Sequence, residues 1–314
     1  MARVLVTRPL VPGGTDPLVH AGIEIVARGD DEPLTPDDLQ AQAADVDGIV
    51  CHLTDRIDAA VLESGHAGRL RVVGNAAVGY DNIDVARAHE LGITVCNTPG
   101  VLDATTADLA FLLILTATRN TSTAEDDLRH GRWDGWGFGA HLSHDVHGAT
   151  LGIVGYGRIG RAVAQRAAGF DMEVLHTSRT DTGLPGYVAE LGVLLARSDI
   201  VSLHVPLTES TRHLIGAAEL ALMKPTAVIV NTARGPVIDE DALADALEAR
   251  RIYGAGLDVF DGEPIVNPRL LRAPRTTLLP HVGSATIETR TAMGRLACQG
   301  VCDVLAGRTP PNLV

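Results

Sequence analysis

Three polar side chains follow three apolar, strand-like segments late in the sequence, and their types could together move a proton beside an anion. The segments are Ala227–Asn231, Gly254–Val259 and Thr277–Pro280, and the side chains after them are Arg234, Glu263 and His281. An arginine fork can hold a carboxylate through paired hydrogen bonds. A histidine titrates near neutral pH, and a neighbouring carboxylate orients the imidazole and stabilises its charged form.

This set of groups fits the reduction of a ketone that carries a carboxylate. Hydride transfer to the carbonyl carbon leaves an alkoxide, which must receive a proton. We expect His281 to donate that proton, Glu263 to support His281, and Arg234 to anchor the substrate. Taken singly, the three have ordinary explanations as a core histidine, a loop acid and a surface arginine. Their placement at successive strand ends, where ligands gather in open α/β sheets, favours the catalytic interpretation.

A glycine-rich loop earlier in the chain predicts a dinucleotide site. Leu151–Val154 leads into Gly155-x-Gly157-x-x-Gly160, and a helical segment rich in Ala and Val follows. In this context Gly155 permits a tight turn, Gly157 lets a pyrophosphate approach the backbone, and Gly160 lets the helix pack on the strand. The helix N-terminus near Arg158–Ile159 would offer N–H groups to phosphate.

The next strand bears on the choice of cofactor. It ends in His176-Thr177-Ser178-Arg179-Thr180, without the acid that usually bonds the ribose 2′-hydroxyl of NAD. Ser178, Arg179 and Thr180 could instead donate to a 2′-phosphate, so we favour NADP(H). The alternative is that Arg179 is a solvated side chain stacking on adenine, with NAD(H) also accepted.

Strands and helices alternate along the whole chain, which predicts an α/β fold with parallel sheets. Five strands are expected before residue 98 and six between residues 150 and 280. The turn Asn97–Gly100 marks the first boundary, and the final helix, about Thr286–Ala306, is expected to return to the first domain. The predicted domains are therefore residues 1–97 with 285–314, and residues 98–284.

Composition excludes several classes of protein. The formal net charge of -13 argues against nucleic acid as a partner. No stretch reaches the roughly 18 apolar residues of a membrane helix, and the N-terminus lacks a signal pattern, so we expect a cytoplasmic protein. The cysteines, Cys51, Cys96, Cys298 and Cys302, are expected to be buried, inert thiols, and no metal site is expected.

The acidic region before the glycine loop has features with several explanations. His141, His144 and His147 recur at every third residue like a metal cluster, but in an irregular loop we expect solvated or structural roles. Trp133 and Trp136 could line a pocket or pack in a subunit interface. The run Glu125-Asp126-Asp127 is expected to be a solvated helix face.

Several motifs together resemble the D-isomer-specific 2-hydroxyacid dehydrogenases, most closely the glyoxylate/hydroxypyruvate reductases. Besides the glycine loop, Ser178–Thr180 and the Arg234 and Glu263 segments, they are Leu53–Asp58, Ala77–Asp84, Asn97–Val101, Pro280–Thr286 and Pro310–Val314. The resemblance implies a Rossmann cofactor domain and a smaller flavodoxin-like substrate domain built from both chain ends. It also implies a homodimer, formed with the helix that begins near Val101.

The resemblance assigns catalysis to Arg234, Glu263 and His281. It implies that the substrate, held by Arg234 and His281, also meets the backbone of Val78 and Gly79, with Leu53 closing the pocket. The implied cofactor contacts are Thr106, Gly155, Tyr156, Gly157, Arg158, Ile159, Gly160, Ser178, Arg179, Thr180, His204, Val205, Pro206, Thr232, Ala233, Asp258 and Gly283, with Asp258 holding the nicotinamide amide.

Some features depart from the pattern of related families. The segment between Arg179 and Ser198 is a few residues shorter than usual, so the adenosine rim is expected to differ. The Ala76–Gly79 loop lacks the lysine of phosphonate dehydrogenases, and no extra cation suits a phosphate on the substrate.

The leading hypothesis is reduction of glyoxylate or hydroxypyruvate by NADPH. Another small 2-keto acid, or NADH, is the alternative within enzymes. A nicotinamide-sensing binding protein like the C-terminal-binding-protein corepressors is the alternative outside them. Turnover of a panel of keto acids discriminates the two classes.

Overall fold

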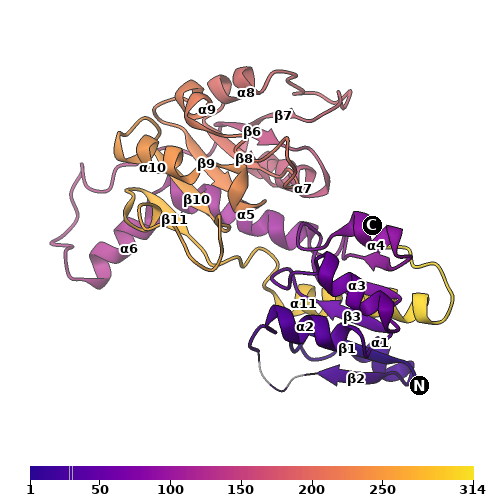
Figure 1. The fold of residues 1–314 in the computed structure, drawn as a ribbon. Helices are drawn as coiled ribbons and strands as arrows, with labels where there is room; N and C mark the ends of the chain where they lie inside the picture. Colours follow the sequence, from indigo (N-terminus) through magenta and orange to yellow (C-terminus); the bar gives the residue numbers. More distant parts are fainter. Residues whose placement is uncertain (28, 30) are drawn as a thin grey trace. The chain divides into compact units, whose positions relative to one another are not determined.

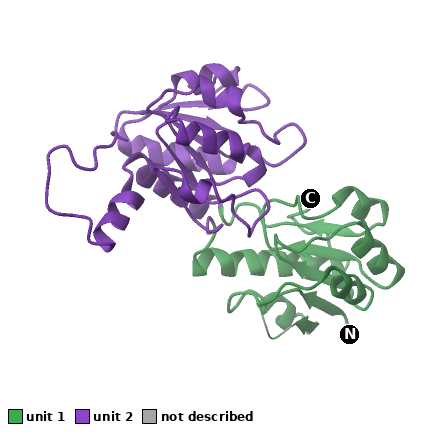
Figure 2. Ribbon diagram, turned by 60° about the vertical axis from the view of Figure 1, so that its left-hand side comes forward, with its two compact units in different colours: residues 1–102, 284–314 green, residues 103–283 purple. Residues whose placement is uncertain are grey.

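The chain forms two compact units, both α/β. The computed structural model describes residues 1–27, 29 and 31–314. Unit 1 contains Met1–Leu102 and Ser284–Val314, and unit 2 contains Asp103–Gly283; both termini lie in unit 1 (Figure 2). The first boundary lies five residues beyond the expected residue 97, and the second lies one residue earlier than expected. The turn at Asn97–Gly100 stays with unit 1 because its backbone bonds there, for example Thr98 N–H to the Ala77 carbonyl at 2.9 Å.

Unit 1 is built on a five-stranded parallel sheet in the order β2-β1-β3-β4-β5 (Figure 1). The strands are β1 (Arg3–Val6), β2 (Glu24–Ala27), β3 (Gly48–Cys51), β4 (Val72–Asn75) and β5 (Thr94–Cys96). The five strands expected before residue 98 are thus confirmed. The three central strands, β1, β3 and β4, are almost wholly buried, as expected for parallel strands covered on both faces.

Helices cover both faces of this sheet. They are α1 (Asp16–His20), α2 (Pro36–Ala43), α3 (Ala59–Ala67), α4 (Val85–Glu90) and α11 (Ile287–Leu305). One apolar core joins the sheet to α2, α3 and α4, and a second joins it to α1 and α11. The return of the final helix to the first unit is thereby confirmed. Helix α1 was not predicted, because its five residues carry too little periodicity to reveal a helix.

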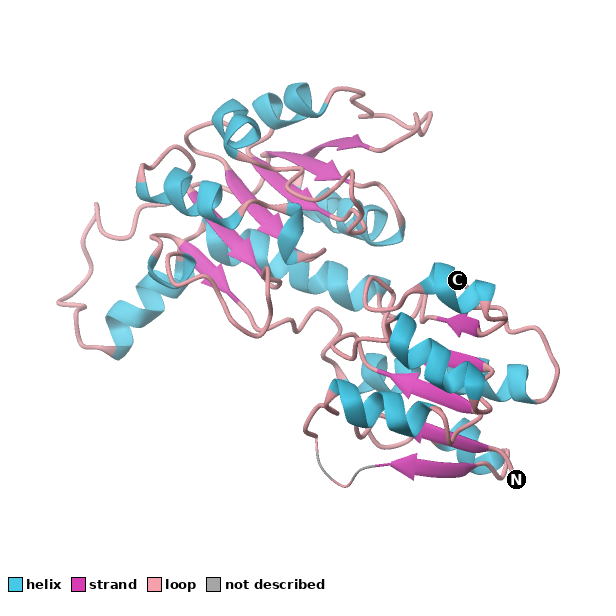
Figure 3. Ribbon diagram, viewed as in Figure 1, coloured by secondary structure: helices cyan, strands magenta, loops and turns pink. Residues whose placement is uncertain are grey.

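Unit 2 is built on a six-stranded parallel sheet in the order β11-β10-β9-β8-β6-β7, and its arrows share one direction (Figure 3). The strands are β6 (Thr150–Val154), β7 (Glu173–Thr177), β8 (Ile200–Leu203), β9 (Val228–Asn231), β10 (Gly254–Leu257) and β11 (Thr276–Leu278). The strand order reverses between β6 and β8, the kind of switch point at which open sheets bind dinucleotides. The prediction of six strands in a Rossmann arrangement is confirmed.

Two apolar cores lie on the two faces of this second sheet. Helices α5 (Asp103–Thr118) and α7 (Arg158–Ala167) cover one face. Helices α8 (Leu191–Arg197), α9 (Ala217–Leu222) and α10 (Glu240–Glu248) cover the other. Short 3-10 turns occur at Ala168–Phe170, Gly235–Val237 and Leu270–Arg272. Both cores are mainly aliphatic, as the scarcity of aromatic residues predicts.

Helix α6 (Thr121–Arg129) and the loop after it extend from the body of unit 2 (Figure 1). The helix buries no residue. Glu125 and Asp126 are more than half exposed, as expected for a solvated acidic face, whereas Asp127 is half-buried and pairs with Arg132. Beyond the helix, Trp136 and Phe138 are 82% and 88% exposed.

The remaining expectations from composition concern membrane spans and thiols. None of the helices in the described part of the chain combines the length and apolar character that a membrane span requires. All four cysteines are buried and reduced. Burial raises the pKa of each thiol, to about 11 for Cys96 and about 12 for Cys298. Thiols of this kind are inert near neutral pH, as predicted.

Candidate active site

The three predicted catalytic residues follow three adjacent strands of unit 2. Because β9, β10 and β11 are neighbours and parallel, the loops after them leave from one edge of the sheet. Arg234 lies in the loop after β9, Glu263 in the loop after β10, and His281 in the loop after β11. The strand order therefore brings together residues that are far apart in sequence.

His281 and Glu263 form a close pair. The His281 Nδ1 atom lies 2.7 Å from Glu263 Oε2, and each side chain is about a quarter exposed. The other carboxylate oxygen of Glu263 accepts a hydrogen bond from the Phe260 N–H at 2.9 Å. Both oxygens of Glu263 are thus engaged, which leaves the Nε2 side of His281 for a substrate.

The surroundings of Glu263 keep it ionised. Burial by itself would raise the pKa of Glu263, but the His281 hydrogen bond and charge, the Phe260 N–H and the charge of Arg234 together lower this pKa below its usual value. The carboxylate therefore stays charged at and well below neutral pH. An ionised partner stabilises the imidazolium form of His281.

The loop that carries Arg234 packs tightly against the loop that carries Glu263. A Cβ atom on Gly235 would lie 1.9 Å from the Phe260 carbonyl carbon, so only glycine fits here. The Asn231 side chain bridges the turn, donating to the Arg234 carbonyl at 2.9 Å and accepting from the Ala233 N–H at 3.0 Å. These contacts fix the backbone at Arg234 and therefore the position of its Cα and Cβ atoms.

His281 has an unusual backbone, and Asp258 holds it in place. The φ of His281 is 53°, in the left-handed region, which costs a non-glycine residue about 1–2 kcal/mol. The carboxylate of Asp258 accepts from the N–H groups of Val282 and Gly283, both at 2.8 Å, and its carbonyl accepts from the His281 N–H at 2.8 Å. Burial raises the pKa of Asp258 to about 6. The family resemblance implies only a nicotinamide contact for Asp258, and nothing in the local sequence indicates these backbone contacts.

The glycine loop has the geometry that its sequence predicts. Gly155 has φ +97° and faces the His204 carbonyl at a distance that admits no Cβ. A Cβ on Gly160 would lie 2.3 Å from the Gly155 carbonyl oxygen, so the helix approaches the loop as closely as expected. Gly157 caps α7, which begins at Arg158, and faces open space. This open cradle at a helix N-terminus fits a dinucleotide phosphate.

The predicted 2′-phosphate residues lie at the end of β7. Arg179 and Thr180 are exposed and Ser178 is half-buried, and the Ser178 hydroxyl donates to the Thr180 carbonyl at 2.6 Å. Beneath them the buried His176 ring stacks on Tyr156 of the glycine loop, with centroids 3.7 Å apart, and its Nε2 lies 2.7 Å from Thr182 Oγ1. Burial, together with the charge of Arg161, lowers the pKa of His176, so this stack is uncharged at neutral pH. Sequence reasoning missed the stack, because nothing local pairs His176 with Tyr156.

The other predicted cofactor residues also lie at this edge of the unit 2 sheet. Val205 and Pro206 follow β8 with His204, whose pKa burial lowers to about 4. Thr232 follows β9, and its buried hydroxyl has no hydrogen-bond partner among the described residues. Thr106, on α5, lies next to Gly283. A Cβ atom built on Gly283 would lie 3.6 Å from the Thr106 methyl carbon.

The other three residues that are expected to contact the substrate lie in unit 1. Leu53 follows β3, and Val78 and Gly79 follow β4. Val78 and Gly79 are half-buried. All three lie at the carboxyl ends of adjacent strands of that sheet.

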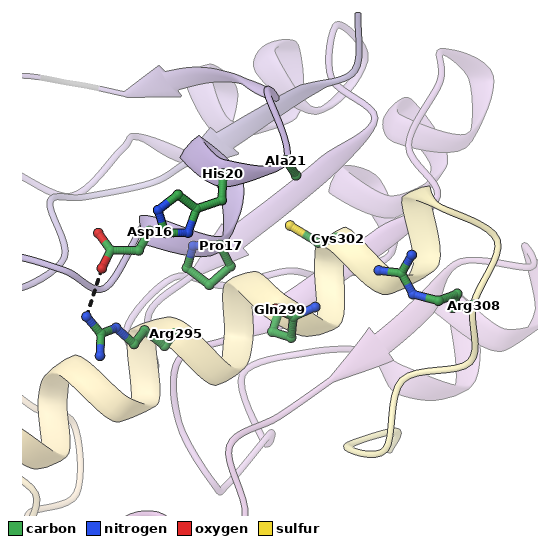
Figure 4. Close-up of a pocket in the computed structure, with 8 residues that line it drawn as sticks. All are labelled: Asp16, Pro17, His20, Ala21, Arg295, Gln299, Cys302 and Arg308. Atoms are coloured by element: carbon green, nitrogen blue, oxygen red, sulfur yellow. Dashed lines mark hydrogen bonds and ion pairs between the residues drawn. The ribbon is translucent and has the colours of Figure 1, made fainter.

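A hollow of about 450 Å³ lies elsewhere in unit 1, between α1 and α11 (Figure 4). Its cations already have partners: Arg295 bonds Asp16 at 2.8 Å, and Arg308 bonds Asp303 at 2.7 Å. It contains none of the residues predicted to bind substrate or cofactor.

The three histidines at every third residue do not gather. His144 is half-buried and packs edge-on against Tyr253 at 4.5 Å, whereas the His147 side chain is 75% exposed. Within residues 1–27, 29 and 31–314, no three His, Cys, Asp or Glu side chains are grouped as metal ligands would be. The expected solvated or structural roles agree with this placement.

Known proteins similar to this chain indicate the same kind of fold. The matched family segment contains the glycine loop. A model of the D-isomer specific 2-hydroxyacid dehydrogenase NAD binding domain matches residues 111–283. The chain is 43% identical over 321 residues to a glyoxylate reductase of Thermococcus gammatolerans, covering 99% of this chain and 95% of that protein.

Two solved structures are similar over almost the whole chain. One is a protein from Thermus thermophilus, with a TM-score of 0.93, 40% identity and 99% of both chains covered. The other is an NADPH-dependent glyoxylate/hydroxypyruvate reductase from Sinorhizobium meliloti in complex with NADP and malonate, with a TM-score of 0.87 and 36% identity, covering 100% of this chain and 96% of that one. Together with the geometry of unit 2, these similarities show that the chain belongs to the D-isomer-specific 2-hydroxyacid dehydrogenases, which are NAD(P)H-dependent oxidoreductases.

Proposed function

We propose that this dehydrogenase reduces glyoxylate or hydroxypyruvate to the corresponding 2-hydroxy acid. The observation that carries the proposal is the His281–Glu263 pair, at 2.7 Å, on the same sheet edge as Arg234. The names of the relatives support the choice of substrates, since one is a glyoxylate reductase and another reduces glyoxylate and hydroxypyruvate.

Each catalytic side chain has a role that its surroundings support. When bound, the nicotinamide supplies the hydride. The Arg234 guanidinium holds the substrate carboxylate and polarises the neighbouring carbonyl. His281 Nε2 donates a proton to the oxygen that becomes the hydroxyl, and Glu263 holds the Nδ1–H and stabilises the charged ring before transfer.

The two units divide these tasks in our proposal. Unit 2 is the dinucleotide-binding domain, and unit 1 is the substrate-binding domain, with Leu53, Val78 and Gly79 facing the keto acid. The sequence of the unit 1 loops supports a small substrate without a phosphate group, because Leu53 and Ala76–Gly79 carry no extra cation.

NADP(H) is the proposed cofactor. Arg179 is exposed at the end of β7, in a strand end that carries no acid to repel a 2′-phosphate. The Sinorhizobium meliloti relative is NADPH-dependent.

The proposed oligomer is a homodimer formed by unit 2. The exposed apolar residues of the arm after α6 are Trp133, Trp136, Phe138 and Leu142, and Leu112 on α5 is 46% exposed. Apolar side chains gathered on an extended segment are typical of a surface that another protein covers. This assigns the two tryptophans to a subunit interface rather than to a pocket.

The catalytic pair is tested by two substitutions. His281→Asn, which tolerates the left-handed backbone, should lower kcat for glyoxylate at least about a hundredfold, with little change in the Kd of NADPH. Glu263→Gln should lower kcat about tenfold or more, because His281 loses the anionic partner that orients its ring and stabilises its charged form. The steady-state rate of NADPH oxidation against pH measures both.

His147→Asn and Glu209→Gln are matched controls at exposed positions and should behave as the unmodified enzyme. Full activity in His281→Asn would remove His281 from the mechanism. Folded enzyme that binds NADPH but turns over no keto acid would support a sensing protein instead.

The cofactor assignment is tested at Arg179. Arg179→Ala should raise the KM for NADPH about tenfold or more, by loss of a charge-assisted hydrogen bond, and should leave the KM for NADH nearly unchanged. Arg272→Ala, at another exposed arginine of unit 2, is the control. An equal loss for both cofactors would refute the phosphate contact.

The proposed dimer is tested by the mass of the protein in solution. Light scattering should give twice the chain mass for the unmodified protein and a smaller mass for the double variant Trp136→Ser, Phe138→Ser. Leu271→Ser, which changes an apolar side chain of unit 2 that is 59% exposed, should leave the dimer intact. A monomeric unmodified protein, or an unaffected double variant, would contradict the assignment.

A further inference from the structure

The loop after β4 in unit 1 holds successive carbonyl groups in fixed directions. The Ala77 carbonyl accepts from the Thr98 N–H at 2.9 Å. The next carbonyl, of Val78, accepts from the side-chain amide of Asn97 at 2.8 Å. Both donors lie just beyond β5, so both carbonyls point toward the end of that strand.

The next carbonyl, of Gly79, accepts from a residue that precedes the loop. The side-chain amide of Asn75, the last residue of β4, donates to the Gly79 carbonyl at 2.8 Å. Asn75 is completely buried. The three consecutive carbonyls of residues 77–79 are therefore all bonded within the protein.

The direction of the carbonyls sets the direction of the peptide N–H groups. In a trans peptide, the carbonyl of one residue and the N–H of the next point opposite ways. The N–H groups of Val78 and Gly79 must then point away from the end of β5. Among the described residues, neither has a backbone acceptor. Successive N–H groups on one side of a turn form a concavity that binds anions.

Asn97 is itself held in place by residues near the other end of the chain. The Asn312 side-chain amide donates to the Asn97 carbonyl at 2.6 Å, and the Asn97 N–H donates to the Asn312 carbonyl at 3.1 Å. Both asparagines are buried, with exposed fractions of 8% and 4%. Asn312 thus fixes the position of Asn97, which in turn binds the Val78 carbonyl.

A fourth asparagine, Asn82, joins the neighbouring loop to this arrangement. The Asn82 amide donates to the carbonyls of His52 and Asp55, at 3.1 and 3.0 Å, on either side of Leu53. Its Oδ1 lies 3.4 Å from Asn75 Nδ2. The loops proposed to contact substrate are thus tied to each other through side-chain amides.

We propose that Asn97 and Asn75 are positioning residues for the substrate carboxylate. By binding the Val78 carbonyl, Asn97 turns the N–H of the same peptide, that of Gly79, toward the anion. Asn75 binds the Gly79 carbonyl and so holds the next peptide of the loop in place. Only a donor can do this, because a carboxylate or apolar side chain at either position would release the carbonyl. The inference rests on the proposed function, since the anion is the carboxylate of the keto acid.

The test compares Asn97→Leu, which keeps a similar volume without a donor, with the unmodified enzyme. We expect the KM for glyoxylate and the Ki for oxalate, measured against NADPH-loaded enzyme, to rise together by about ten- to a hundredfold. The value of kcat should fall much less, and the Kd of NADPH should be unchanged. Asn75→Leu and Asn312→Ala, which remove less direct supports of the loop, should give smaller rises.

Leu62→Ala, a buried residue of α3 away from the loop, controls for lost stability alone. It should lower Tm without changing the Ki for oxalate. Asn97→Ala, which also removes the donor, serves if Asn97→Leu does not fold. A folded Asn97 variant with an unchanged KM and Ki, or one that loses only kcat, would overturn the proposal.

Failure of the proposed function would be visible separately. In that case the unmodified enzyme would neither reduce glyoxylate nor bind oxalate, and the positioning role would fall with it.

Discussion

The arrangement of the candidate active site in unit 2 depends on the hydrogen bond between His281 Nδ1 and Glu263. It joins loops that follow neighbouring strands, so it requires β10 and β11 to be adjacent and parallel. It also requires His281 to keep a left-handed backbone, which the carboxylate and carbonyl of Asp258 enforce. Buried polar groups of this kind contribute only when all of their partners are satisfied.

The same arrangement determines the charge of Glu263. Glu263 stays ionised although burial opposes it, because His281, the Phe260 N–H and Arg234 all act in the other direction. The imidazole therefore faces a negative charge on its Nδ1 side, and its Nε2 is the atom available for proton transfer. A positive guanidinium near the same carboxylate suits an anionic substrate, as a 2-keto acid is at neutral pH.

Much of this could be predicted from sequence, because the principles involved are local. The glycine loop lies between a strand and a helix, and Arg234, Glu263 and His281 each follow an apolar run, so strand periodicity was enough to place them. Contacts between distant segments gave no such signal. The clamp of Asp258 on residues 282 and 283, and the pairing of Asn97 with Asn312 across 215 residues, depend on tertiary structure alone. The same contacts explain why unit 1 extends past the predicted boundary at residue 97.

The most direct measurement of the central claim is the tautomer and hydrogen bonding of His281, read by nitrogen NMR of the imidazole across pH. We predict that the neutral ring carries its proton on Nδ1, in a hydrogen bond to Glu263, and leaves Nε2 bare. A neutral ring protonated on Nε2, with Nδ1 bare, would contradict it.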